Sequence, residues 1–463
     1  MFDAAASLLV TLKSIVGEAN VLTADADVAS YVTDWRERYR GRTRAVVRPG
    51  STDEVAAVVR CCAGHRVPIV PQGGNTGLCG GATPHATGDE VVLTLTRMNR
   101  VRAIDADDAT MTVEAGMPLA GVQQAAAAAG MLFPLSLASE GSCAIGGNLS
   151  TNAGGVNVLR YGTAREQVLG LEVVLPDGRV WNGLRGLRKD NTGYDLKQLF
   201  LGAEGTLGII TAAVLRLHPK PSASATAWIA LASAAAAMEL LAFLRARLGE
   251  RLSAFELVSR ACVEAVLAFA PGTQDPLAQP HPWYVLVEIA DSGEEQPLRE
   301  RVERALMEAA ERGALADAAL AQSGEQSREL WRIRETIPEA QFTNVKHDVS
   351  VPVARIPEFI DRAGRSLRER FGEIAIYCFG HVGDGNLHYN VGSEALMARR
   401  EEVSRVVYDT LDAFGGSISA EHGLGQLKRE EIRRHKHPLE LELMRGLKRM
   451  LDPRGLMNPG KLL

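Results

Sequence analysis

Two histidines, His381 and His388, lie seven residues apart in the motif CFGHVGDGNLHYN, residues 378–390. The residues between them are mainly glycine, aspartate and asparagine, which favour tight turns, and the flanking residues are apolar and β-prone. The motif therefore predicts a turn between two strands, with one imidazole on each side. A second cluster, SAEHGLG, contains the adjacent residues Glu421 and His422. Imidazoles and a carboxylate near glycine-rich backbone suit a metal ion or a catalytic base, while the plain alternative is a histidine that only satisfies local hydrogen bonds.

The composition excludes some functions that the motif alone would allow. The chain of 463 residues carries a net charge of −5 and only 5% aromatic residues, so neither a basic surface nor a base-stacking platform for nucleic acid is indicated. The apolar content of 46% and charged content of 23% are ordinary for a globular protein of two or three domains. The six cysteines form no CxxC pair, which suits a reducing compartment, and we expect the protein in the cytoplasm.

The two most apolar stretches do not predict a membrane span. The N-terminal residues 1–20 lack a basic leader and a clear cleavage site, and they predict a short amphipathic helix. The longest apolar run, residues 125–138, contains Pro134 and is too short to cross a bilayer. At most a peripheral contact with a membrane is expected.

The hydrophobic pattern predicts an alternation of helices and strands in both halves of the chain. In the first half, Ser51 or Thr52 can cap a helix that runs to about Ala63. Strands are expected at 67–70, 91–95 and 111–116, a helix from Pro118 to near Gly130, and a hairpin at 168–181. After the linker-like residues 220–226, strands alternate with helices in a pattern that indicates an α+β domain with an antiparallel sheet. Further helices are expected at 294–313, 354–371, 397–414 and 429–451.

Two glycine-rich stretches, residues 71–84 and 141–155, cannot be the interior of a regular element. The first follows a predicted strand, as a phosphate-binding loop does, and its glycines permit close approach of the backbone to a ligand. Asn75 and Thr76 would add side-chain donors. The loop matches neither a Walker loop nor the GxGxxG fingerprint, so a plain surface loop is the alternative.

Five motifs, in this order along the chain, closely resemble the FAD-binding domain of the vanillyl-alcohol oxidase superfamily: PQGGNTGLCGGATP, GGNLSTNAGGVNVLRYG, VLPDGRV, NTGYDL and GAEGTLGIIT. The motifs HVGDGNLH and SAEHGLG and the ending LDPRGLMNPGKLL resemble its FAD-linked D-2-hydroxyacid dehydrogenase branch. The resemblance covers nearly the whole chain and implies an α+β fold. It implies a two-subdomain FAD-binding domain of PCMH type over residues 1–219 and an α+β substrate (cap) domain with an antiparallel sheet over 220–425. A C-terminal helical segment, 426–463, would return to the FAD-binding domain.

The same resemblance implies a set of FAD-binding residues. Residues of the first loop would hold the pyrophosphate, those of the second would line the flavin and its ribityl chain, and three later residues would face the adenosine or dimethylbenzene portion. Because the first loop carries no histidine for covalent attachment, we expect non-covalent FAD. The implied residues are Gly73, Gly74, Asn75, Thr76, Gly77, Ser139, Gly146, Gly147, Ser150, Asn152, Gly155, Glu204, Gly205, Ile210 and, near the C-terminus, Asn458.

The implied reaction oxidises an alcohol carbon beside a carboxylate, and it needs help to remove the hydroxyl proton. By the resemblance, His381, His388 and Glu421 are metal ligands, with zinc favoured over iron or manganese. His422 is the candidate base, since a histidine bound to a dication cannot take a proton. For Asp384 we favour an Asx-turn over metal binding.

Cations are expected to hold the carboxylates of the substrate. Arg334 matches the carboxylate-binding arginine of the family, while the neighbouring Arg332 is interpreted as a solvated charge. Lys346 matches a lysine of the hydroxyglutarate branch, and Asn390 would contact the same substrate. A second cation suits a second carboxylate, so oxidation of D-2-hydroxyglutarate to 2-oxoglutarate ranks first. D-lactate, glycolate and D-malate remain alternatives.

Electrons would leave the flavin for an external acceptor, such as an electron-transfer flavoprotein, a quinone or a cytochrome, because no haem or iron–sulfur motif occurs. A homodimer is compatible with the sequence. Two other classes of protein are alternatives: a flavin-free, metal-dependent hydrolase, and a non-catalytic subunit of a larger oxidase. The intact set of candidate ligands argues against the second of these.

Overall fold

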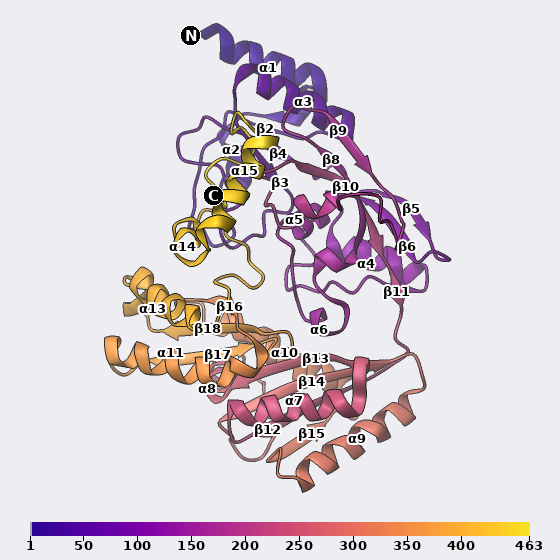
Figure 1. The fold of residues 1–463 in the computed structure, drawn as a ribbon, viewed down its shortest axis with the longest axis vertical. Helices are drawn as coiled ribbons and strands as arrows, with labels where there is room; N and C mark the ends of the chain where they lie inside the picture. The colour runs from indigo at the N-terminus through magenta and orange to yellow at the C-terminus, as the bar shows by residue number, and fades with distance from the viewer. Residues whose placement is uncertain (1) are drawn as a thin grey trace. The chain divides into compact units, whose positions relative to one another are not determined.

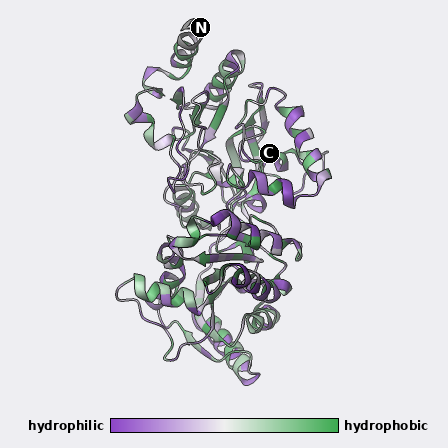
Figure 2. Ribbon diagram, turned by 90° about the vertical axis from the view of Figure 1, so that its left-hand side faces the viewer, coloured by the Kyte–Doolittle hydropathy of each residue, from purple (hydrophilic) through white to green (hydrophobic). Residues whose placement is uncertain are grey.

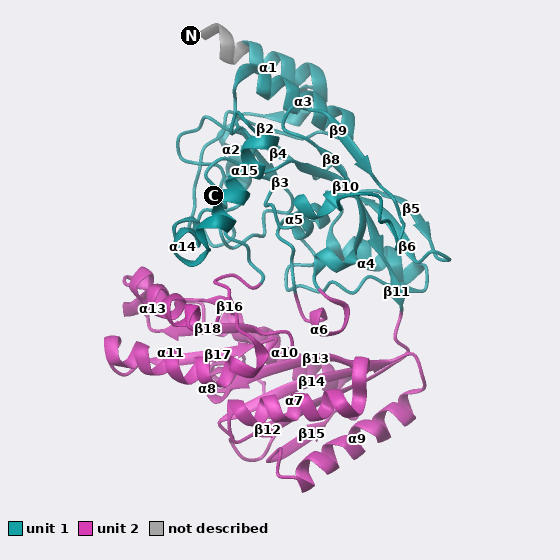
Figure 3. Ribbon diagram, in the orientation of Figure 1, with its two compact units in different colours: residues 1–154, 163–219, 421–463 teal, residues 155–162, 220–420 magenta. Residues whose placement is uncertain are grey.

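A computed structural model describes residues 2–463 (Figure 1). The chain forms two compact units (Figure 3). Unit 1 consists of residues 1–154, 163–219 and 421–463, and unit 2 consists of residues 155–162 and 220–420. Each unit is therefore built from segments that are far apart in the sequence.

Unit 1 begins with a four-stranded sheet in the order β1-β2-β4-β3, in which β2 and β3 run parallel to β4 and β1 runs antiparallel to β2. The helix predicted after residue 51 is present, and Ser51 caps it by accepting a hydrogen bond from the backbone N–H of Glu54. The elements are α1 (Phe2–Val16), β1 (Val21–Leu22), α2 (Asp25–Val28), β2 (Ala45–Val47), α3 (Thr52–His65), β3 (Ile69–Gln72) and β4 (Val91–Thr94).

A second, five-stranded antiparallel sheet has the order β5-β6-β10-β8-β9. The hairpin predicted at 168–181 is confirmed as β8–β9, with Gly178 at a positive φ of 81° in its turn. The elements are β5 (Val101–Asp105), β6 (Thr110–Glu114), α4 (Leu119–Ala128), β7 (Met131–Leu132), α5 (Ile145–Ser150), β8 (Val168–Val174), β9 (Val180–Gly183), β10 (Ile209–Arg216) and β11 (His218–Pro219).

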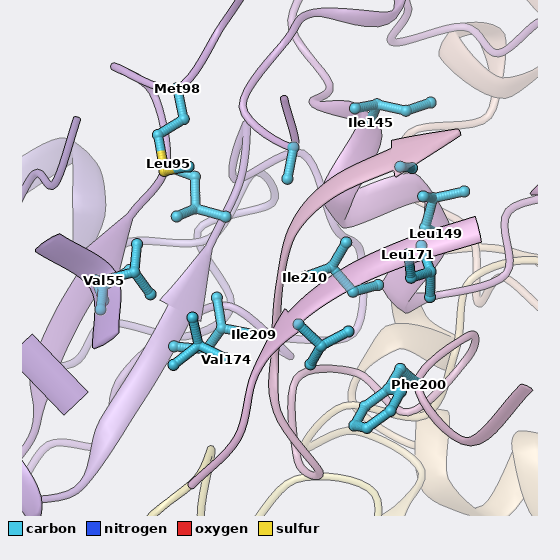
Figure 4. Close-up of a cluster of buried hydrophobic side chains, with 14 of the residues drawn as sticks. Val55, Leu95, Met98, Ile145, Leu149, Leu171, Val174, Phe200, Ile209 and Ile210 are labelled. Carbon is cyan, nitrogen blue, oxygen red and sulfur yellow. The ribbon is translucent and has the colours of Figure 1, made fainter. Parts of the chain in front are cut away.

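One apolar core joins the two sheets of unit 1. It contains Val55 of α3 and Leu93 of β4 from the first sheet region, and Leu149 of α5 and Ile209 of β10 from the second. Figure 4 shows part of this core around Ile209 and Ile210. Burial of these side chains fixes the ends of the strands, and the glycine-rich loops begin there.

The C-terminal segment is held against the first sheet of unit 1. Met457 forms a parallel bridge with Ile69 of β3, and Asp452 accepts hydrogen bonds from the backbone N–H groups of Leu456 and Met457. The helical region predicted at 429–451 is confirmed, but it consists of two helices, α14 (Arg429–His435) and α15 (Pro438–Leu451). The break has a local cause, because Pro438 cannot continue α14 and instead begins a helix capped by His437.

Unit 2 contains a seven-stranded antiparallel sheet in the order β15-β12-β14-β13-β17-β18-β16, which confirms the predicted antiparallel α+β architecture. Its strands are β12 (Ala223–Leu231), β13 (Leu252–Ser259), β14 (Trp283–Asp291), β15 (Asp317–Leu320), β16 (Asp348–Ser350), β17 (Ala375–Gly380) and β18 (Asn386–Gly392). Its helices are α6 (Val158–Tyr161), α7 (Ala234–Leu248), α8 (Arg260–Phe269), α9 (Glu295–Glu311), α10 (Gly324–Ala340), α11 (Ile356–Phe371), α12 (Glu394–Met397) and α13 (Arg400–Asp412).

The two outer strands of this sheet were not anticipated from the sequence. β15 reads DAAL, with none of the β-branched or aromatic residues that indicate a strand, and it forms by pairing with β12. Many of the helices carry polar and apolar residues on different sides, as Figure 2 shows by their mixed purple and green colouring. Among residues 2–463, no helix is both long and apolar enough to cross a lipid bilayer.

The contacts of Asp452 generate a prediction about stability. Besides two backbone N–H groups, its carboxylate accepts a hydrogen bond from Nζ of Lys448, at 2.6 Å, and it is 3% exposed. Asp452→Ala should lower the free energy of unfolding by about 2 kcal/mol or more, because it leaves the two backbone N–H groups without their acceptor and removes the anion beside Lys448. Urea denaturation measures this, with the exposed Asp107→Ala as a control that should stay within about 0.5 kcal/mol of wild type. Equal stability of both variants would contradict this account of the C-terminal segment.

Candidate active site

The histidine motif forms the predicted strand–turn–strand. β17 and β18 pair antiparallel, with Phe379 opposite His388, and His381 lies in the turn between them. The carboxylate of Asp384 accepts a hydrogen bond from the backbone N–H of Asn386 at 3.1 Å, which confirms the Asx-turn. Burial raises the pKa of Asp384 to about 6, although the nearby His381 opposes this shift. Gly385 adopts a positive φ of 95°, and a Cβ there would lie 2.7 Å from the carbonyl oxygen of Val351.

A buried carboxylate on the neighbouring strand β13 holds this turn. Oε1 of Glu256 lies 2.5 Å from Nδ1 of His381, and its Oε2 accepts a hydrogen bond of 2.8 Å from Nε of Arg334 on α10. Burial by itself would raise the pKa of Glu256, but the charges and hydrogen bonds of His381 and Arg334 outweigh it and lower the pKa to about 2. Glu256 therefore remains an anion that connects the predicted carboxylate-binding arginine to a predicted metal ligand.

Phe379 links Arg334 to the second histidine. The guanidinium of Arg334 lies 4.9 Å from the centre of the Phe379 ring, and that ring lies 4.8 Å from the imidazole of His388. The rings of His381 and His388 are 6.2 Å apart, with an angle of 72° between their planes. Packing of the aromatic rings therefore helps to fix both imidazoles, and His381 is also held by its contact with Glu256.

The two imidazoles have the chemistry of metal ligands. Because Nδ1 of His381 is engaged by Glu256, Nε2 is the nitrogen through which this ring could bind an ion. Nδ1 of His388 lies 4.0 Å from Oδ1 of Asp348, which also accepts a hydrogen bond from the side chain of Asn386. A metal-binding histidine is usually supported by a carboxylate beside the ring nitrogen that does not bind the metal, since this carboxylate orients the ring and raises its basicity. The donor set of unit 2 therefore fits a divalent ion.

Arg334 and Lys346 lie near the same end of α10. Arg334 is 6% exposed, and within residues 2–463 its two Nη atoms have no hydrogen-bond partner in the protein. Nζ of Lys346 donates a hydrogen bond of 2.7 Å to the carbonyl oxygen of Pro338, four residues after Arg334 on the helix. Four residues correspond to about 6 Å along a helix axis. The ammonium of Lys346 is therefore anchored about one turn of helix beyond the backbone of Arg334.

Asn390 supports the segment that carries Lys346. Its Oδ1 accepts a hydrogen bond from the backbone N–H of His347, and its Nδ2 donates one to Oε1 of Gln341. The ring of His347 is itself fixed between the carbonyl oxygen of Tyr389 and the hydroxyl of Ser404. These contacts place Asn390 beside the predicted cation site, where its side chain holds the backbone next to Lys346.

Glu421 and His422 belong to a loop of unit 1 that Glu204 holds in place. The two carboxylate oxygens of Glu204 accept hydrogen bonds from the backbone N–H groups of Leu424 and Gly425, at 2.7 and 2.8 Å. Burial raises the pKa of Glu204, although these two N–H groups oppose the shift. Oε1 of Glu421 lies so close to Gly154 that a Cβ there would be only 2.8 Å away. The loop of the candidate base therefore lies against the second glycine-rich stretch.

The two glycine-rich loops of unit 1 lie against each other. A Cβ at Gly74 would lie 2.0 Å from the carbonyl oxygen of Ser142, so only glycine permits this approach, whereas a Cβ at Gly77 or Gly147 would face open space. The buried Oδ1 atoms of Asn148 and Asn458 have no hydrogen-bond partner within the described residues. Open glycine backbone beside unused polar atoms fits the binding of a large phosphorylated cofactor.

Several of the predicted cofactor residues use their side chains within the protein. The amide of Asn75 donates to the carbonyl oxygens of Ser30 and Thr33, so the side-chain donor expected there is not free, and its backbone is what this position offers a ligand. In the same way, the side chain of Ser150 bonds to Gly146, and that of Asn152 bonds to Thr163 and Arg165. Asn458 donates to the carbonyl oxygens of Gly81 and Glu204. These residues shape the loops.

The predicted site residues are divided between the two units. Unit 1 contains Glu421, His422 and the predicted FAD-binding residues except Gly155, and hydrogen bonds bring Ser150, Glu204 and Asn458 together there. Unit 2 contains Gly155 and the predicted residues of the histidine and cation sites, which are His381, His388, Arg334, Lys346 and Asn390.

Glu256 is the functional candidate that the sequence analysis missed. It is fully buried in strand LSAFELVS, whose other residues are mostly apolar. Burying a charged residue without a partner costs free energy, so a glutamate within such an apolar strand indicates that a cation lies beside it. Its partners could not be named in advance, because Arg334 and His381 lie 78 and 125 residues away in the sequence.

Comparison with known families finds two matches. Residues 43–183 match the family described as FAD binding domain, and residues 220–462 match the family described as FAD linked oxidases, C-terminal domain. Among curated proteins, the chain is 42% identical over 98% of its length to a D-2-hydroxyglutarate dehydrogenase of Xanthomonas citri, of which 96% is covered. It is 41% identical over 98% of its length to the mitochondrial enzyme of that name from Bos taurus, of which 83% is covered.

A further relative is a putative mitochondrial D-lactate dehydrogenase of Schizosaccharomyces pombe, 37% identical over 97% of this chain and 88% of the relative. Among solved structures, p-cresol methylhydroxylase is similar with a TM-score of 0.79 and 18% identity, over 100% of this chain and 97% of that one. Alkyldihydroxyacetonephosphate synthase gives a TM-score of 0.74 and 17% identity, over 98% and 84% of the two chains. At these identities the two structures show the fold alone, which is of the vanillyl-alcohol oxidase type, as expected.

The bonds of Glu256 generate a second prediction. Glu256→Ala should lower the free energy of unfolding by about 3 to 5 kcal/mol, because it leaves the buried guanidinium of Arg334 without its anion. Glu256→Gln keeps an acceptor for Nε of Arg334 and should lower the free energy of unfolding clearly less than Glu256→Ala does. Urea denaturation of both variants, beside the exposed Glu250→Ala, measures the difference. If Glu256→Ala is as stable as Glu250→Ala, the carboxylate does not stabilise Arg334.

Proposed function

Since the chain belongs to the FAD-linked oxidases and is an FAD-dependent hydroxyacid dehydrogenase, we propose that it oxidises D-2-hydroxyglutarate to 2-oxoglutarate with the help of a divalent metal ion. The observation that carries the choice of substrate is the second cation, Lys346, anchored about one helical turn from Arg334. The family membership also removes the flavin-free hydrolase from consideration.

The two cations suit the two carboxylates of a five-carbon hydroxy acid. A guanidinium with unused Nη atoms can bind a carboxylate through two parallel hydrogen bonds. The ammonium of Lys346, which its hydrogen bond to the carbonyl oxygen of Pro338 holds in place, would present a compact positive charge to the other carboxylate. D-lactate has only one carboxylate, so it would use one of these cations and leave the other without a partner.

The remaining residues would orient the substrate and remove its proton. Bound FAD supplies the acceptor for the hydride that leaves the carbinol carbon. Arg334 would fix the carboxylate next to that carbon, and Glu256 would hold Arg334 in position. His422 would accept the hydroxyl proton, since it is half-buried and lies on the loop that Glu204 holds. The hydroxyl of an alcohol loses a proton only with difficulty in water, which is why a base and a metal ion act together.

For the metal site we propose His381, His388 and Glu421 as ligands. The chain itself limits how far Glu421 can lie from the histidines: Ser417 pairs with Ser350 in unit 2, and Glu421 follows Ser417 by four residues, a span of at most about 14 Å. Ser350 in turn lies opposite Asn386, two residues from His388. Two imidazoles and one carboxylate leave positions open for substrate oxygens, and zinc is favoured, with iron or manganese as alternatives.

We further propose that FAD is bound non-covalently, since residues 71–84 contain no histidine, and Cys79 donates to the carbonyl oxygen of Gly423. The electron acceptor is an external flavoprotein, quinone or cytochrome. The six cysteines are free thiols, which suits a reducing compartment such as the cytoplasm. D-lactate is the second candidate substrate, favoured by the similarity to a relative named as a putative D-lactate dehydrogenase.

The substrate assignment is tested by adding single D-2-hydroxy acids anaerobically to the purified protein and following the loss of flavin absorbance. Wild type should be reduced faster by D-2-hydroxyglutarate than by D-lactate. Lys346→Ala should slow reduction by D-2-hydroxyglutarate about tenfold or more, because the second carboxylate loses its partner, and should change reduction by D-lactate much less.

Arg332→Ala is the matched control, because Arg332 is exposed on the same helix and should affect neither substrate. Equal losses for both acids in Lys346→Ala would refute the dicarboxylate assignment while leaving a D-2-hydroxyacid dehydrogenase. No reduction of wild-type flavin by any D-2-hydroxy acid, with metal present, would refute the proposed function itself.

The metal assignment makes a separate prediction. His388→Ala should give a folded, yellow protein that no longer oxidises substrate, because FAD binds in unit 1 while the ion loses a ligand. Metal analysis of the purified variant should show a lower metal content than wild type, and a chelator should inactivate wild type until zinc is restored. Loss of FAD from the variant, or full activity after complete removal of metal, would show that the histidines serve a structural purpose.

A further inference from the structure

Helix α15 of unit 1 presents an apolar stripe to solvent. Leu439, Leu443 and Met450 are 55%, 61% and 66% exposed, and Gly446 lies between them with open space where a Cβ would be. Their spacing of four, three and four residues follows the a and d positions of a heptad repeat. The apolar side chains of this two-heptad seam are thus more than half exposed to solvent.

The opposite face of α15 is fixed to the body of unit 1. Leu441 is 6% exposed, and Nζ of Lys448 donates to the carbonyl oxygens of Thr206 and Met457 and to the carboxylate of Asp452. Leu441 and Lys448 are seven residues apart, so both occupy the heptad position that points away from the seam. These contacts fix the rotation of α15 about its axis, so the apolar stripe remains on the solvent-facing side of the helix.

The charges beside the stripe identify the partner. Glu442 and Arg449 occupy the two g positions, are exposed, and have no ion-pair partner within residues 2–463. In an antiparallel pair of helices, g positions face g positions, so Glu442 of each copy meets Arg449 of the other. In a parallel pair, Glu442 would instead face the apolar Leu447. The charge pattern is complementary to itself only in the antiparallel arrangement.

We propose that α15 is a self-association surface, on which the same helix of a second copy of this chain packs antiparallel about a two-fold axis. Leu439 then faces Met450 of the other copy, and Leu443 packs on Gly446, whose missing side chain permits close approach. An isologous contact of this kind closes the assembly as a dimer. Two heptads bury less surface than a stable interface of about 1,200 Å² or more, so the dimer is expected to be concentration-dependent.

The proposal is tested with the FAD-containing holoprotein by analytical ultracentrifugation over about a hundredfold range of concentration. Wild type should shift from monomer to dimer, and Leu443→Glu should remain monomeric, because it places a charge in the seam of both copies. Glu442→Arg and Arg449→Glu should each weaken dimerisation by about tenfold or more, since each sets like charges against one another.

The charge reversals give the decisive comparison. The double variant E442R/R449E should recover wild-type dimerisation, and a mixture of the two single variants should form a heterodimer, because opposite charges then meet again. Circular dichroism and bound flavin absorbance show that each variant is folded. Wild type that stays monomeric at all concentrations, or a dimer that Leu443→Glu does not affect, would overturn the proposal. Failure of the double variant to recover would overturn the antiparallel arrangement.

A membrane surface is the competing occupant of the stripe. Wild-type protein that stays monomeric in solution, but co-sediments with vesicles of anionic phospholipid and loses this binding in Leu443→Glu, would assign the stripe to lipid and overturn self-association. Under the present proposal, vesicles should bind wild type and Leu443→Glu equally weakly.

Discussion

The buried negative charge of Glu256 is the constraint on which the rest of unit 2 depends. An anion inside a protein is tolerated only when cations and hydrogen bonds replace its water, and here Arg334 and His381 each contact one of its two carboxylate oxygens. The cost of separating them keeps α10 and the β17–β18 turn in position against β13. One carboxylate thereby orients both the group that would bind the substrate and a group that would bind the metal.

Unit 1 uses an analogous arrangement with backbone partners. Glu204 binds the N–H groups of Leu424 and Gly425 through its side chain, while its own carbonyl oxygen accepts from Asn458. It has a positive φ of 51°, which a non-glycine residue adopts only when its surroundings compensate the strain. Glu204 therefore holds both the loop that contains Glu421 and His422 and the C-terminal segment that contains Asn458.

The end of α10 shows how an irregularity becomes useful. Pro338 lies inside the helix near its C-terminus, where the last carbonyl groups have no partner within the helix. Lys346 uses the carbonyl oxygen of Pro338 itself, and this fixes a long, flexible cation that would otherwise sample many rotamers. A lysine anchored in this way binds a carboxylate at a smaller entropic cost than a free one.

The sequence by itself determined the local features of this protein and its family. Turn residues in HVGDGNLH, the cap at Ser51 and the hairpin at 168–181 are read correctly because each depends on contacts within a few residues. The prediction that residues 141–155 contain no interior of a regular element is wrong, because Ile145–Ser150 form the short helix α5, in which Gly146 packs too closely against Ala115 to leave room for a side chain. Glu256 with its two partners, the strand β15 and the use of the Asn75 side chain by Ser30 and Thr33 were decided only by the tertiary structure. Each of these depends on groups that come from distant parts of the chain. The free energy of such contacts depends on burial in the folded protein, and burial cannot be predicted from a local pattern of residues.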